Sequence, residues 1–157
     1  MEGNPIFMQK AIALATENVT SGRGGPFAAV IVRDGEIVAT GTNLVTATND
    51  ATAHGEIVAI RNACAALGSF QLDGCQIYTS CEPCPMCLTA IYWARCNAIF
   101  YGCTSADAAN VGFDDALLYE QINRPTKQRS IPAINLLHQQ ALSSFNAWRV
   151  QTDRIDY

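Results

Sequence analysis

Two short motifs, far apart along the chain, limit how the sequence can fold. One is His54-x-Glu56, and the other is the run that begins at Pro83 and contains Cys84 and Cys87. A stretch with helical character follows each motif, so each lies at a predicted helix start. Helical side chains tilt toward the N-terminus of their own helix. The fold must therefore bring two helix N-termini together if these side chains are to act at a common point.

The residue types in these motifs are those of a catalytic zinc centre. His54, Cys84 and Cys87 would supply three protein ligands, which leaves one position open, as in catalytic rather than structural sites. We therefore expect one Zn²⁺ per subunit, which lowers the pKa of a bound water to about 7. Glu56 is the natural group to carry protons from that water to a ring nitrogen and a leaving amine. The combined pattern is the signature of zinc deaminases.

Each motif taken alone has a simpler interpretation. A lone Cys-x-x-Cys also occurs in redox pairs, and a lone His-x-Glu also occurs at solvated helix starts. Cys81 adds a third thiol, but it precedes the predicted helix and should point elsewhere. A four-cysteine structural zinc is disfavoured because the sequence has no second Cys-x-x-Cys pair. The other cysteines are expected to pack as small hydrophobic residues: Cys64, Cys75, Cys96 and Cys103.

The composition favours one compact domain spanning residues 1–157. Hydrophobic residues make up 49% of the chain and charged residues 15%, which suits a sizeable core. The sequence has no apolar run long enough for a membrane span, and its first residues lack the pattern of a secretory signal. We therefore expect a cytoplasmic protein with no membrane partner, in which disulfide pairing is disfavoured.

The charge pattern favours a small-molecule ligand. The net charge is −4 and the pI is about 5.0. The 10 Lys and Arg residues are scattered along the sequence, so no cluster forms the basic stripe that binds phosphate backbones. A nucleic-acid partner is therefore not expected.

Alternating helical and strand patterns predict an α/β fold. Strands are expected at residues 27–32, 37–41, 76–79, 98–102 and 131–137. Helices are expected at residues 5–19, 54–67, 85–94, 114–122 and 143–154. The Asp34-Gly35 pair is a hairpin signal between the first two strands. Strands separated by helices favour parallel neighbours covered on both faces. The predicted architecture is a three-layer α/β/α sandwich with a mixed five-stranded sheet.

Loop segments hold further candidate residues. The glycine-rich loop at residues 22–25 lacks the Gly-Lys-Ser/Thr ending of a phosphate-binding loop. It is expected to bring its backbone close to the mouth of a pocket. Asn43 ends the second predicted strand and is either a turn residue or an amide that bonds the edge of a base. Asp114 and Asp115 have the residue type of a helix N-cap and of a first-turn acid, and one of the two is expected to have such a role.

The chain resembles the short bacterial guanine deaminases of the cytidine deaminase-like fold nearly end to end. The resemblance is carried by residues 24–27, 52–54, 78–87, 90–95 and 112–115, and by the terminal Tyr157. It implies that Phe27 stacks on a purine and Asn43 bonds the purine edge. It implies that Asp115 contacts the ring and helps to move protons to the leaving amine. It also implies a domain-swapped homodimer, in which a C-terminal segment (about residues 140–157) crosses to a partner and Tyr157 closes the partner's active site.

One position departs from this family, which usually has Ala where this chain has Gly55. Fungal-type cytosine deaminases carry Gly there. Glycine in a first helical turn costs up to about 1 kcal/mol, and it either loosens the helix start or makes room beside the substrate. The resemblance thus implies, as the leading hypothesis, hydrolysis of guanine to xanthine and ammonia. Cytosine or an aminotriazine is the alternative substrate.

Two further hypotheses are weaker. A deaminase acting on adenosine in transfer RNA should carry a basic surface, and the acidic charge balance disfavours it. A non-catalytic module that keeps zinc only for stability should have lost Glu56 or a ligand, and the sequence retains all of them.

Overall fold

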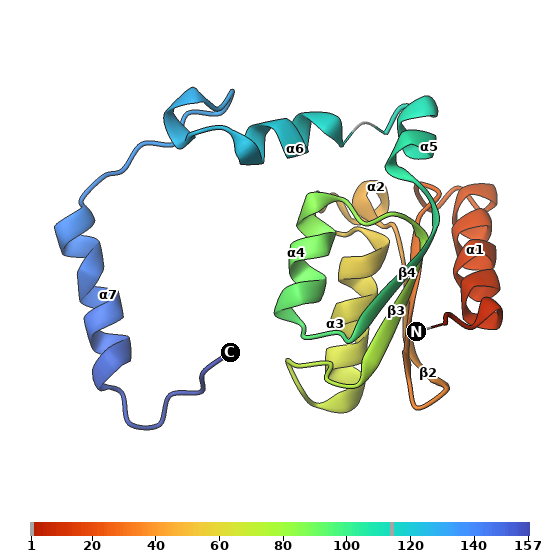
Figure 1. The fold of residues 1–157 in the computed structure, drawn as a ribbon, viewed down its shortest axis with the longest axis horizontal. Coiled ribbons are helices and arrows are strands. Elements are labelled where there is room, and N and C mark those ends of the chain that lie inside the picture. The colour runs from red at the N-terminus through yellow and green to blue at the C-terminus, as the bar shows by residue number, and fades with distance from the viewer. Residues whose placement is uncertain (1, 114) are drawn as a thin grey trace. The chain divides into compact units, whose positions relative to one another are not determined.

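The protein is described by a computed structural model that covers residues 2–113 and 115–157. Asp114, the expected start of one helix, lies outside the described residues. The chain divides into two compact units, residues 1–115 and residues 116–157. Their elements are shown in Figure 1.

The first unit is built on a mixed sheet with strand order β2-β1-β3-β4. The strands are β1 (Ala28–Arg33), β2 (Glu36–Thr42), β3 (Cys75–Cys81) and β4 (Ala98–Cys103). Strand β1 pairs antiparallel with β2 and with β3, and β3 pairs parallel with β4. At the β1–β2 turn, Asp34 and Gly35 have φ of 52° and 80°. A two-residue turn with positive φ at both central residues has a backbone twist that matches that of the flanking strands. The predicted hairpin is confirmed.

Helices cover both faces of the sheet (Figure 1). They are α1 (Pro5–Thr20) on one face, and α3 (Gly55–Leu67) and α4 (Pro85–Trp93) on the other. Side chains of β1 alternate between the layers, as the strand period requires. Ala29 and Ile31 pack in the core that includes residues of α3 and α4, while Val30 and Val32 pack in the core beside α1. The predicted three-layer sandwich is confirmed.

Two short helices were not expected from the sequence. They are α2 (Val45–Thr48), inside a predicted polar loop, and α5 (Ser105–Asn110). Helix α5 begins with a capping box, in which Thr104 and Asp107 each bond the other's backbone. This reciprocal capping satisfies N–H groups that a short helix otherwise leaves unpaired.

The second unit contains α6 (Ala116–Asn123), the 3-10 helix η1 (Thr126–Gln128) and α7 (His138–Val150). Helix α7 begins and ends before the predicted bounds of 143–154. The fifth strand predicted at 131–137 is wrong, because the sheet has four strands and this segment pairs with none of them. Apolar spacing alone cannot form a strand without a partner edge, and Pro132 cannot donate to a ladder.

The structure also bears on membrane-spanning helices and on the packing of the cysteines. No helix in the described part of the chain is long and apolar enough to cross a membrane. All seven cysteines are free. Cys75 is buried and Cys64 and Cys96 pack against the core. Cys103 is exposed near the end of the edge strand, so its predicted core position is wrong.

Candidate metal centre and pocket

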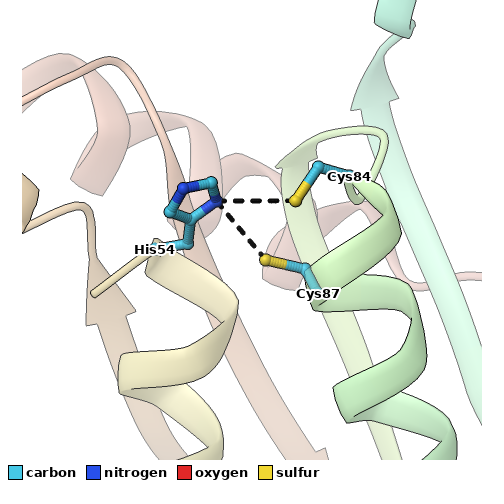
Figure 2. A group of neighbouring side chains, drawn as sticks. All are labelled: His54, Cys84 and Cys87. Atoms are coloured by element: carbon cyan, nitrogen blue, oxygen red, sulfur yellow. Dashed lines mark hydrogen bonds between the residues drawn. The ribbon is translucent and has the colours of Figure 1, made fainter. Parts of the chain in front are cut away.

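The side chains of His54, Cys84 and Cys87 meet at one point (Figure 2). Nδ1 of His54 lies 3.6 Å from Sγ of Cys84 and 3.5 Å from Sγ of Cys87. Their candidate ligand atoms all lie within 4.8 Å of one another. The structure therefore brings together the three side chains that the sequence predicts as metal ligands.

Two helix starts create this cluster. His54 and Cys84 are the N-cap residues of α3 and α4, with extended backbones at ψ of 155° and 167°. Neither side chain caps its own helix, so both remain available to a shared ligand. Pro85 occupies the first turn of α4, where its missing N–H has no intrahelical role. Cys87 follows within that turn, and the positive ends of both helix dipoles favour thiolates between them.

The spacing and chemistry of the donors fit zinc. Tetrahedral zinc with bonds of about 2.3 Å to sulfur and 2.0–2.1 Å to nitrogen holds S and N about 3.5–3.6 Å apart. The measured separations of 3.6 and 3.5 Å between the His54 nitrogen and the two sulfurs match this value. One imidazole and two thiols also form the mixed donor set that zinc prefers. A fourth position is left for water or substrate.

The electrostatics of the metal-free cluster favour a single shared thiolate. The hydrogen bond from Cys87 lowers the pKa of Cys84 to about 4, against the opposing effect of burial. The same hydrogen bond raises the pKa of Cys87, and burial raises it further. A hydrogen bond to Cys84 raises the pKa of His54. At neutral pH the cluster therefore already carries one of the anionic sulfurs that a metal requires.

Glu56 lies in the first turn of α3 and is 7% exposed. Burial is the main cause that raises the pKa of its carboxyl, because a desolvated carboxylate loses its hydration. A carboxylate with a raised pKa is a stronger base than an ordinary one, which suits a group that takes a proton from water. Glu56 also lines the same cavity as His54 and Cys84, so it is positioned to exchange protons with a molecule held there.

The metal cluster opens into a cavity of about 290 Å³. Phe27, Asn43 and Asp115 are among the residues that line it. The ring of Phe27 meets that of Phe113 edge to face, with centroids 4.8 Å apart and an interplanar angle of 87°. Asn43 is only 8% exposed, and its backbone N–H donates to the Phe27 carbonyl at 2.9 Å. An apolar wall and a buried amide thus face the metal cluster across one small space.

The family model for the cytidine and deoxycytidylate deaminase zinc-binding region matches residues 1–103, the part of the chain that carries the metal cluster and Glu56. The chain belongs to this deaminase family. The predicted family and zinc as its cofactor are confirmed. The protein is accordingly an enzyme of the hydrolase class that acts on C–N bonds.

Relatives of this deaminase include proteins that act on different bases. It is 53% identical over 151 residues to the guanine deaminase of Bacillus subtilis, covering 96% of this chain and 97% of that protein. An X-ray structure of guanine deaminase from Bacillus subtilis matches with a TM-score of 0.96 and 51% identity over 99% of both chains. The tRNA-specific adenosine deaminase of Agrobacterium fabrum is 47% identical over 77 residues, which cover 49% of this chain and 51% of that protein.

The departure at Gly55 has a steric explanation in this deaminase. A Cβ at position 55 would lie 2.9 Å from Cα of Ala28 and 3.1 Å from the Phe27 carbonyl oxygen. Both contacts are to backbone atoms, which cannot rotate away. Gly55 therefore makes room for strand β1 rather than for substrate, and it lets the start of α3 lie directly against the segment that carries Phe27.

Sequence reasoning missed two residues around the pocket. Phe113 lies in a motif used only for resemblance, and it pairs with Phe27. Asn18 is fully buried on α1, and the signal that could have revealed it is an amide on the same stripe as the buried Ala11 and Ala15. Tyr157 belongs to the second unit, where its ring lies edge-on to Trp148 with centroids 6.5 Å apart.

Proposed function

We propose that this deaminase catalyses the hydrolysis of guanine to xanthine and ammonia. The observation that carries this proposal is the 53% identity to a guanine deaminase over 96% of the chain. The pocket is consistent with it, because a cavity of about 290 Å³ suits a small flat ligand. The net charge of −4 supports a free base over a polyanionic RNA substrate.

Base binding would use the wall opposite the metal cluster. Phe27, steadied by the edge-to-face contact with Phe113, offers a ring face on which a purine can stack. The Asn43 side chain carries both a donor and an acceptor and would pair with the edge of the purine. Asp115, which also lines the cavity, would accept a hydrogen bond from a ring N–H or from the exocyclic amine.

Proton transfer would be the work of Glu56. Zinc held by His54, Cys84 and Cys87 supplies a Lewis acid that lowers the pKa of water. Glu56 takes a proton from the attacking water as the new C–O bond forms at C2 of guanine, and it delivers that proton to the ring nitrogen beside C2. The C2–N bond to the exocyclic amine then breaks as the new C2 hydroxyl becomes a carbonyl, and Glu56 and Asp115 together would move the hydroxyl proton to the departing amine. One guanine and one water thus yield one xanthine and one ammonia.

The second unit supports a homodimer in which Tyr157 acts on a partner subunit. None of the described residues in this unit is buried. Large apolar side chains are exposed along it: Ile134 at 85%, Leu136 at 79%, Phe145 at 67% and Val150 at 78%. A segment with so much exposed apolar surface requires a covering surface. We propose that residues 140–157 exchange between two copies of the chain and that Tyr157 covers the partner's pocket.

A panel of bases tests the proposed substrate. Ammonia release is measured for guanine, cytosine, adenine and an aminotriazine, with zinc content determined on the same samples. We expect turnover of guanine. Conversion of cytosine or the aminotriazine with guanine left untouched would show that the substrate is wrong while leaving the proton chemistry intact. Salt-sensitive binding and deamination of transfer RNA would favour the RNA-acting relatives instead.

A further inference from the structure

Asn18 is an amide on a helix stripe that is otherwise built from alanine. It lies on the buried stripe of α1, after Ala11 and Ala15, and is 0% exposed. Burying an amide costs free energy unless its polar atoms find partners. Its Oδ1 has no hydrogen-bond partner among the described residues, so the hydrogen bonds that compensate for burial are those of its Nδ2 group.

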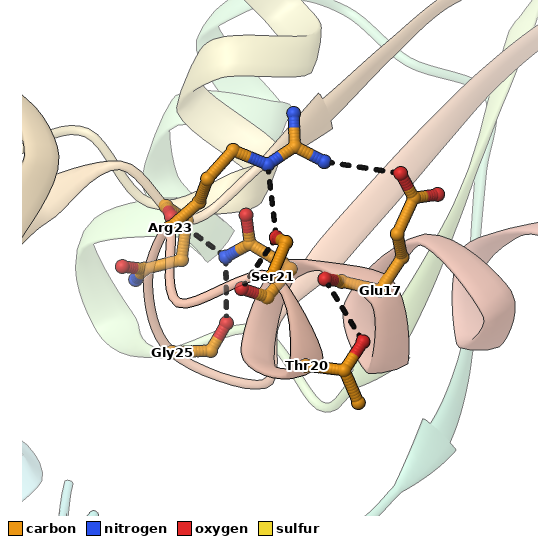
Figure 3. Close-up of polar contacts among 7 residues, drawn as sticks. Glu17, Thr20, Ser21, Arg23 and Gly25 are labelled. Carbon is orange, nitrogen blue, oxygen red and sulfur yellow. Dashed lines mark hydrogen bonds and ion pairs between the residues drawn. The ribbon is translucent and has the colours of Figure 1, made fainter.

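The Nδ2 group of Asn18 joins two segments of the pocket wall. It donates to the Gly25 carbonyl and to the Asn43 carbonyl, each at 2.9 Å. Figure 3 shows the bond to Gly25 within the loop that follows α1. Arg23 closes the outer side of that loop through Glu17 and Ser21 at 3.3 and 3.1 Å. The contacts of Arg23 are solvent-exposed and contribute little to the stability of the loop, whereas the Asn18 amide is buried.

The glycine-rich loop is shaped to pass over this amide. A Cβ at Gly24 would lie 2.2 Å from the Asn43 carbonyl oxygen and 3.0 Å from Nδ2 of Asn18. The backbone carbonyl of Asn18 also accepts hydrogen bonds from the backbone N–H groups of Arg23 and Gly24, at 3.0 and 3.3 Å. The end of β2, the glycine loop and the end of α1 therefore meet around one buried side chain.

The same amide controls the wall that faces the metal cluster. Gly25 and Asn43 both line the cavity. The Asn43 N–H donates to the Phe27 carbonyl at 2.9 Å, so a shift of Asn43 moves Phe27 with it. The metal cluster sits on α3 and α4 and shares none of these bonds.

We infer that Asn18 is a positioning residue for nucleobase binding, which holds Asn43 and Phe27 at a set distance from the metal cluster. It touches neither substrate nor metal. This inference rests on the proposed function, because it assigns Asn18 to the base-binding wall. Its loss should weaken binding of the base and relax discrimination between bases, while zinc remains bound and the proton chemistry continues at saturating substrate.

The experiment compares Asn18→Ala and the isosteric Asn18→Asp with wild type. Asn62→Ala is the matched control, because Asn62 Nδ2 donates to the Thr40 carbonyl at 2.9 Å at an exposed position that does not line the cavity. KM, kcat, zinc content and the melting temperature are measured with guanine, or with whichever base wild type deaminates. We expect KM to rise about tenfold in Asn18→Ala, from the loss of one buried and one part-buried hydrogen bond, with kcat changed less than KM. Asn62→Ala should keep the wild-type KM.

The Asn18→Asp variant adds a readout that a purely structural role would not move. The introduced carboxyl can donate to one of the two carbonyls only while it is protonated. The ratio of its KM to that of wild type should therefore fall as the pH is lowered. A melting temperature that drops in Asn18→Ala with unchanged KM and unchanged base preference would overturn the inference. Wild type that deaminates cytosine but not guanine would instead overturn the proposed substrate, and the KM comparison would then be made with cytosine.

Discussion

Gly55 and Ala28 touch through their backbones, with no space between them for a methyl group. A Cβ at Gly55 would lie 2.9 Å from Cα and 3.1 Å from N of Ala28. That N–H is also held by the Ser80 hydroxyl at 3.1 Å. The start of strand β1 is thus held between β3 and the first turn of α3. Gly55 directly follows the metal ligand His54, and Ala28 directly follows Phe27.

We expect Gly55→Ala to displace β1 and with it Phe27. The unfolding free energy should fall by about 1–3 kcal/mol, the usual cost of overpacking, and kcat/KM should fall while zinc stays bound. Ala28 precedes the alternation of Val30 and Val32, so its methyl points toward α1. Adding Ala28→Gly gives the strand room to retreat, and the double variant should recover much of the loss. Thermal denaturation and kinetics of the three variants measure the coupling. Additive losses would contradict the steric explanation.

Glu56→Gln tests the proton carrier. The amide keeps the shape of the side chain but cannot exchange protons, so kcat should fall by about 10²–10⁴-fold. Zinc content should match wild type, because the ligands are His54, Cys84 and Cys87. Metal analysis and ammonia release on the same preparation check both statements. Retained turnover would rule out Glu56 as the proton carrier.

Removal of the metal should expose a thiolate at Cys84. Its pKa near 4, due first to the hydrogen bond from Cys87, keeps it ionised at pH 6. Burial raises the pKa of Cys81 to about 11 and of Cys96 to about 12, so those thiols stay protonated. After chelation, iodoacetamide at pH 6 should therefore modify Cys84 first.

The labelling is best read in a Cys103→Ser background, which removes the exposed cysteine. Peptide mass spectrometry identifies the modified site, and zinc-loaded protein serves as the protected control. Labelling of Cys81 before Cys84, or equal labelling with and without zinc, would contradict the assignment of Cys84 as a ligand.

Truncation before Tyr157 should lower kcat/KM and leave zinc in place, because the proposed lid contributes nothing to the metal cluster. Co-refolding the truncated chain with Glu56→Gln chains tests whether the lid acts across subunits. A mixed dimer has one site with both an intact Glu56 and the partner's Tyr157, so about one quarter of wild-type activity should return. No recovery in the mixture, or full activity after truncation, would exclude a shared lid.

The sequence predicted those parts of the molecule that depend on local chemistry. The Asp34-Gly35 turn, the start of α4 at Pro85 and the end of α3 at Gly68, whose φ is 62°, follow from backbone preferences. The convergence of His54 with the two cysteines could also be anticipated, since a metal needs them together. The resemblance to a family predicted Phe27 and Asn43 as base-binding residues, a role that local chemistry alone left open, and both residues line the cavity.

The parts that depend on long-range contacts were not predictable. Asn18 gains its role only when the end of β2 folds over α1, and a helical asparagine alone does not reveal that. The clash at Gly55 depends on the spacing between α3 and β1. The segment 131–137 has a strand-like composition, yet strand formation requires a neighbouring edge that the sequence does not specify. Helix α5 was missed because the capping pair Thr104 and Asp107 begins a helix of only six residues.

The pairing of β3 with β1 has a consequence for how this enzyme can evolve. The two strands are matched from Arg33–Cys75 to Ala29–Thr79, and β3 leads directly into the turn that presents Cys84. An insertion or deletion of one residue in β3 would reverse the facing of its side chains and carry the cysteines away from His54. A change in length by a single codon within β3 should therefore disturb the metal cluster and the core together.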